Sequence, residues 1–299
     1  MLIDDVVDFS DKKFNTYGNR CGCGQCNHPN KKCSGSCYNC LYQIHFPTRF
    51  DAEPVKSLYD CPKMIYHYVC QYSYLYATEL LCAYQEETNY LRDYHIMSLG
   101  CGGCADLMAF ERFYRDISAN VPISYIGVDV NELWRPVNNR IKKYCEKERI
   151  KYKVRYHDVF KCFRRNEVVD ANILIISYLI SYLYNTKQIS TIDTFVEDVV
   201  NNIVQKKIAG HKFLIIINDV NSNRRGRDYF DYFIRKLSKY KLSILNFNYK
   251  YFDTGNLYPP QKIGTPYAVR ESLFLFQKHF VRNIMRKNIV NKLSNSFWR

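Results

Sequence analysis

Short apolar segments alternate with helix-like segments from about residue 94 to residue 280. Predicted strands cover 95–99, 123–128, 152–156, 171–177 and 213–217, and predicted helices cover 105–117, 131–149, 192–207 and 228–240. The strand at 171–177 is almost entirely apolar, which is typical of a strand buried on both faces of a parallel sheet. The alternation predicts an α/β fold with a doubly wound, mostly parallel sheet. Two last predicted strands, 243–252 and 272–280, have no helix between them and would add an antiparallel terminal strand pair.

The first of these strands runs into a glycine-containing turn and then into a helix, over Leu99-Gly100-Cys101-Gly102-Gly103-Cys104-Ala105-Asp106. Glycines let the backbone approach a ligand closely, because no Cβ stands in the way, and a helix N-terminus offers N–H groups to that ligand. Asp129 ends the next strand, where a carboxylate accepts the hydroxyls of a ribose. Asp158 follows the third strand, where it is placed to read an adenine amino group.

With these three elements in order, residues 94–280 resemble the class I methyltransferases that depend on S-adenosylmethionine (SAM). Cys104 stands where that family often has a third glycine, at a position that mainly packs the helix on the strand. A nicotinamide dinucleotide is the alternative cofactor, but the terminal strand pair suits it less well. The resemblance implies a SAM site formed by Leu99, Gly100, Cys101, Gly102, Asp106, Asp129, Val130, Asp158, Val159 and Ser177.

Candidate catalytic residues follow the fourth and fifth predicted strands, because loops at the carboxyl edge of such a sheet concentrate substrate contacts. Ser177 and Tyr178 follow the fourth strand, and Asp219 follows the fifth as a candidate base or substrate anchor. Arginines at 224–227 offer phosphate or carboxylate contacts, although an ordinary Asn-rich surface loop is the competing interpretation. The sequence lacks the tetrad of Asn or Asp, two prolines and an aromatic residue that many amino-group methyltransferases of nucleic acids have. Its absence argues against methylation of exocyclic adenine or cytosine nitrogens.

Six of the 13 cysteines crowd together near the N-terminus, at Cys21, Cys23, Cys26, Cys33, Cys37 and Cys40. The Cys-x2-Cys pairs 23/26 and 37/40 predict a four-thiolate zinc site, with the remaining cysteines available for a second ion. An iron–sulfur cluster is the alternative occupant. The spacing from Cys33 to Cys40 is also that of radical SAM enzymes, but the doubly wound pattern downstream argues against their barrel fold.

This pattern divides the chain into a Cys-rich metal-binding module at 1–61, a linking helix at 62–93 and a SAM-binding methyltransferase domain at 94–299. Within the first part, residues 1–20 show little periodicity and are expected to form only a lead-in. Pro62 is well placed to begin the linking helix, which contains no further proline and no glycine up to Leu91.

The chain is basic, with a net charge of +14 from 43 Lys and Arg against 29 Asp and Glu. No acidic residue follows Glu271, so the C-terminal tail is a candidate arm for nucleic acid, although a solvated surface explains such a tail equally well. We find no run of about 20 apolar residues that would span a membrane and no secretory signal at the N-terminus. A cytoplasmic location without membrane attachment is therefore expected.

Taken together, these patterns predict a SAM-dependent methyltransferase whose acceptor is unidentified, with RNA or another macromolecule slightly favoured. Two alternatives stay open. One is a non-catalytic, zinc-containing binding or scaffold protein on a methyltransferase-like fold, and the other is a methyltransferase that acts on a small molecule.

Overall fold

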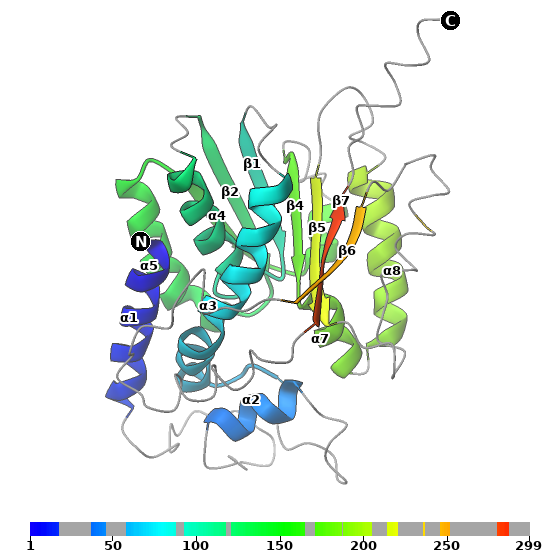
Figure 1. The fold of residues 1–299 in the computed structure, drawn as a ribbon. Coiled ribbons are helices and arrows are strands. Elements are labelled where there is room, and N and C mark those ends of the chain that lie inside the picture. The colour runs from blue at the N-terminus through cyan, green and yellow to red at the C-terminus, as the bar shows by residue number, and fades with distance from the viewer. Residues whose placement is uncertain are drawn as a thin grey trace, which may run out of the picture.

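A parallel β-sheet lies at the centre of the molecule (Figure 1). The computed structural model describes residues 1–17, 37–45, 58–87, 93–117, 121–164, 171–186, 188–204, 214–220, 236, 246–251 and 280–286. Five strands run parallel in the order β3-β2-β1-β4-β5. An α/β fold with a parallel sheet is therefore confirmed. The strands are β1 (Tyr94–Leu99), β2 (Ile123–Asp129), β3 (Lys151–Tyr156), β4 (Ile173–Ser177) and β5 (Leu214–Val220).

The backbone ladder continues beyond β5 with β7 (Phe280–Arg286) and then β6 (Asn246–Tyr251). β7 runs antiparallel to β5, with Asp219 opposite Arg282, and β6 runs antiparallel to β7. The predicted strand at 272–280 lies outside the described residues except for Phe280. The predicted helix at 228–240 likewise lies outside them except for Lys236.

Helices cover both faces of the sheet. The apolar side chains of β4 accordingly point into a core on each face. Ile173 and Ile175 pack in a core with α1, α3, α4 and α5, whereas Leu174 and Ile176 pack in a second core with α6, α7 and α8. Alternate side chains of a strand point to opposite faces, so a continuous apolar run serves both cores. The helical elements are α1 (Leu2–Thr16), α2 (Cys37–His45), α3 (Pro62–Glu87), α4 (Ala105–Asp116), η2 (Glu132–Trp134), α5 (Arg135–Lys147), α6 (Val159–Arg164), α7 (Leu179–Asn185), α8 (Ile189–Val199) and η3 (Val200–Val204).

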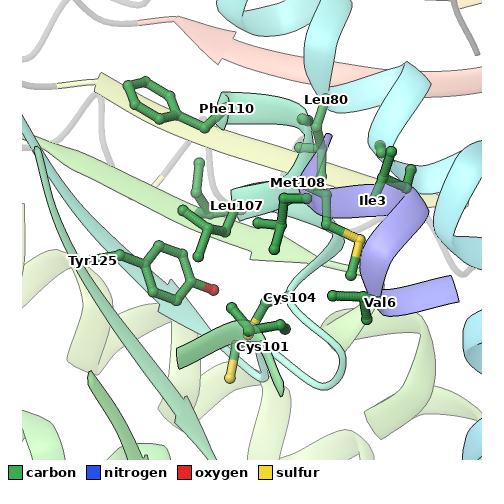
Figure 2. Close-up of a cluster of buried hydrophobic side chains, with 14 of the residues drawn as sticks. Ile3, Val6, Leu80, Cys101, Cys104, Leu107, Met108, Phe110 and Tyr125 are labelled. Atoms are coloured by element: carbon green, nitrogen blue, oxygen red, sulfur yellow. The ribbon is translucent and has the colours of Figure 1, made fainter. Parts of the chain in front are cut away.

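The N-terminal segment is a helix that contributes to the main core, which corrects the expectation of a lead-in at 1–20. Leu2, Ile3, Val6 and Val7 of α1 are all fully buried. Figure 2 shows Ile3 and Val6 beside Leu80 and Met108, which come from α3 and α4. The spacing of the four α1 residues, with Asp4 and Asp5 between the apolar pairs, is that of one buried face of an amphipathic helix, so the signal was present in the sequence.

Among the helices of the described residues, none is both long and apolar enough to cross a membrane.

Candidate functional site

The turn between β1 and α4 has the backbone geometry that its glycines allow. Gly100 and Gly102 have φ of +68° and +47°, where a side chain would be strained. The N–H groups of Gly100 and Cys101 both donate to the carbonyl of Val128, at 2.8 and 3.1 Å, which ties the turn to the end of β2. Cys104, at the start of α4, also adopts a positive φ of +56°.

Asp129 connects the end of β2 to this turn through its carboxylate. One oxygen accepts from the N–H of Gly102 at 2.8 Å, and the other accepts from the N–H of Asn131 at 2.8 Å. Burial raises the pKa of Asp129 to about 6, and the two N–H donors oppose that shift. The two hydrogen bonds therefore hold the carboxylate in a fixed position at the carboxyl edge of the sheet, where β2 ends.

A cavity of about 1270 Å³ opens at this edge. Pockets of roughly 300–1,000 Å³ hold one drug-sized ligand, so this cavity has room for a cofactor and a further molecule. Among its lining residues are eight that the sequence singled out: Gly100, Gly102, Asp129, Val130, Asp158, Val159, Ser177 and Tyr178. Val130 is 72% exposed, which gives the cavity an open apolar face. Asp158 also accepts from the N–H of Phe160 at 3.0 Å and so caps the start of α6.

Four other singled-out residues do not line this cavity. Leu99 is fully buried in β1, and Cys101 is buried beside Gly127. Asp106 lies behind the turn and accepts from the hydroxyl of Tyr125 at 3.0 Å, and burial raises its pKa to about 6. Asp219 accepts from the N–H of Ser181 at 3.0 Å and so caps α7. In this structure, Asp106 and Asp219 support the site from behind.

Tyrosine rings form a wall of the same cavity, and of these tyrosines only Tyr178 is among the candidates predicted from the sequence. The aromatic wall consists of Tyr59, Tyr68, Tyr72, Tyr76, Tyr178 and Tyr182. Tyr72 and Tyr76 are stacked with ring centroids 5.4 Å apart, and Tyr76 lies 4.1 Å from Tyr178. Three of these tyrosines are spaced four residues apart on α3, which places them on one face of the helix. That spacing was the available signal.

A buried carboxyl group connects the aromatic wall to β5. Both oxygens of Glu79, on α3, accept from the hydroxyl of Tyr178, at 2.9 and 3.1 Å, and one accepts from the amide of Asn218 at 2.8 Å. Burial raises the pKa of Glu79 to about 8, and the carboxyl is therefore mostly protonated at neutral pH. Glu79 thus fixes the position of the Tyr178 ring.

The predicted metal ligands fall largely outside the described residues. Cys21, Cys23, Cys26 and Cys33 lie outside them, whereas Cys37 and Cys40 lie on α2 and are buried in one cluster with Cys61. Within the described part of the chain, no group of three or more metal-ligating side chains is present.

Comparison with known proteins gives a likeness of fold. No protein-family model and no curated protein matches the sequence. Among solved structures, the plantazolicin methyltransferase BpumL in complex with SAH is 13% identical with a TM-score of 0.40, over 84% of this chain and 95% of that one. A putative SAM-dependent methyltransferase from Streptococcus mutans is 12% identical with a TM-score of 0.43, over 71% of this chain and 47% of that one. These likenesses of fold do not indicate an activity or an acceptor for this chain.

Proposed function

We propose that this protein is a SAM-dependent methyltransferase. The observation that carries the proposal is the buried Asp129 carboxylate, held by the Gly102 N–H where the glycine turn and a large cavity meet. A ribose hydroxyl donates to such a carboxylate, and a glycine backbone admits the rest of the cofactor without a steric clash.

The lining residues fit SAM part by part. Asp129 would accept the ribose hydroxyls, and Asp158 would accept from the adenine amino group. Val130 and Val159 offer apolar surface to the flat base. At Gly100 any side chain would be strained by the φ of +68°, and its Cβ would lie 3.0 Å from Leu179. A residue larger than glycine is therefore disfavoured at this position.

When bound, SAM supplies an electrophilic methyl group on a sulfonium. The chain's own residues would position the acceptor opposite that methyl and exclude water from it. Ser177 and Tyr178 line the cavity at the end of β4. Tyr178 has a positive φ of +54°, a strained conformation of the kind found at functional sites. Burial raises the pKa of Tyr178 well above its usual value, so we expect it to act as a neutral group that orients substrate.

Binding of the demethylated product S-adenosylhomocysteine (SAH) tests the proposal. Calorimetry should detect SAH binding to the wild-type chain and no NAD binding, and Asp129→Ala should abolish the SAH signal. Asp116→Asn, in an exposed ion pair with Arg112, is the matched control and should bind SAH normally. Folded protein that binds NAD and ignores SAH would refute the assignment.

Retained catalysis distinguishes the enzyme from a scaffold protein on the same fold. Labelled methyl transfer from SAM into fractions of a cell extract should yield a labelled acceptor that the Asp129→Ala variant does not produce. Protein that binds SAH but transfers no label to any fraction would favour the scaffold.

Two further assignments are part of the proposal, and both rest on the sequence. The cysteines from Cys21 to Cys40 would hold zinc, and elemental analysis should find zinc, whereas a brown, iron-containing protein would contradict this.

The basic C-terminal tail would bind nucleic acid, and affinity for RNA should then fall steeply with salt and with removal of residues 287–299.

A further inference from the structure

Uncharged aromatic side chains line a large part of the cavity. Tyr182 lies 5.7 Å from Tyr59, and Tyr68 lies 5.3 Å from Trp134, which itself packs beside Gly102. The aromatic wall is therefore continuous with the proposed SAM site. Burial raises the pKa of Tyr59, Tyr68 and Tyr182, so these phenols stay neutral at physiological pH.

The charge of this lining is opposite to that of the whole chain. The protein carries a net charge of +14, yet no lysine or arginine is found among the described residues that line the cavity. Three carboxylates do line it, from Asp60, Asp129 and Asp158. Carboxylates and the negative faces of aromatic rings attract cations and disfavour anions.

We propose that the acceptor is an amine, bound against the aromatic wall next to the cofactor. This inference rests on the proposed SAM site, because the wall and the glycine turn share one cavity. Aromatic rings arranged in this way are a known means of binding ammonium groups.

The charge balance of methyl transfer supports an amine in this setting. A bound ammonium first loses a proton to water. The lone pair of the resulting uncharged amine then forms the new bond to the methyl carbon, and the pair of the breaking C–S bond stays on sulfur. The positive charge therefore moves from sulfur to nitrogen, and the cavity holds one positive charge before and after the step. A proton on the product nitrogen of a primary or secondary amine then leaves to water. An anionic acceptor would instead face three carboxylates with no lysine or arginine among the described lining residues.

Three indole probes that differ only in the charge of their side chain test the inference. Protein saturated with SAH would be titrated by calorimetry with tryptamine, tryptophol and indole-3-propionate, which carry an ammonium, a hydroxyl and a carboxylate. We expect tryptamine to bind about tenfold or more tightly than indole-3-propionate, with tryptophol between them.

Paired variants separate the contribution of the ring from that of general packing. Tyr68 and Tyr182 are only half-buried, which makes them the safest wall positions to change. Tyr182→Phe and Tyr68→Phe keep the ring and should keep the preference for tryptamine, whereas Tyr182→Leu and Tyr68→Leu should weaken tryptamine binding several-fold more than tryptophol binding. Tyr114→Leu, on α4 and outside the cavity lining, is the control and should leave the preference unchanged.

The outcomes keep this inference distinct from the proposed function. If folded protein does not bind SAH, the SAM assignment fails and the acceptor inference fails with it. If SAH binds but tryptamine does not bind, or indole-3-propionate binds as tightly, the amine inference alone is overturned. Equal losses for tryptamine and tryptophol in the leucine variants would overturn it as well.

Discussion

Burial raises the pKa of Asp129 to about 6. Ligand binding at this carboxylate should therefore depend on pH. A protonated carboxyl accepts ribose hydroxyls less well, so we expect SAH affinity to fall by up to about tenfold per pH unit below pH 6. Calorimetry between pH 5 and pH 8 measures this fall. Asp129→Asn should bind SAH weakly and without this pH dependence, and a wild-type affinity that stays constant across the range would contradict the assignment.

Glu79 predicts a pH dependence of stability. Its pKa is raised from 4.5 to about 8 in the folded protein, so its contribution to the free energy of unfolding is fully present below pH 4.5 and is lost as pH rises through 8. The melting temperature of the wild type should therefore fall between about pH 5 and pH 8 and level off above that. In Glu79→Gln, which keeps one hydrogen-bonding oxygen and cannot ionise, this part of the fall should disappear.

The hydrogen bond from Tyr178 provides a second check on Glu79. It lowers the Glu79 pKa in opposition to burial, so Tyr178→Phe should move the stability loss to higher pH. A shift to lower pH would mean that another group is responsible.

Residues of the site differ in how far the sequence revealed them. Asp129 and Gly102 were found because each occupies a fixed place relative to a predicted strand end. Glu79 was missed because its partners Tyr178 and Asn218 lie 99 and 139 positions away. Only the packing of α3 against the sheet brings them together, and no local pattern encodes it.

At the scale of elements, β2 depends on a glycine where it passes the turn. A Cβ on Gly127 would lie 2.7 Å from the Sγ of Cys101, and both residues are in the closely packed interior. Gly127→Ala should therefore lower the free energy of unfolding by about 1–3 kcal/mol, as measured by urea denaturation. Cys101→Ala removes the obstructing sulfur and should recover part of the loss in the double variant, whereas purely additive losses would contradict this explanation.

Strands and the long helices other than α1 were largely predicted, and short helices were not. β1 to β5 begin and end within about two residues of their predicted limits, except that β5 extends three residues further. α2, α6 and α7 have nine residues or fewer, and so too few turns for an amphipathic period to stand out. The first turn of α7 is capped by the Asp219 carboxylate, which accepts from the N–H of Ser181 in a contact between elements distant in sequence.

At the scale of the whole molecule, α1 joins the N-terminus to the core of the α/β fold. Its apolar face is buried against α3, α4 and α5, and its polar residues add specific contacts. Asp4 accepts from the hydroxyl of Tyr74 at 3.0 Å, and Asp5 pairs with Arg140. The N-terminal helix is therefore part of the same folded core as the sheet.

This attachment predicts that α1 supports stability and leaves ligand binding unchanged. Ile3 is fully buried, so Ile3→Ala should lower the free energy of unfolding by about 2–5 kcal/mol, the usual effect of removing a large buried aliphatic side chain. Lys12→Ala, at an exposed position of the same helix, is the control and should change stability by less than about 0.5 kcal/mol. Because the Ile3 side chain does not line the cavity, the SAH affinity of folded Ile3→Ala at 25 °C should match that of the wild type. A loss of affinity without a loss of stability would instead place α1 in the binding machinery.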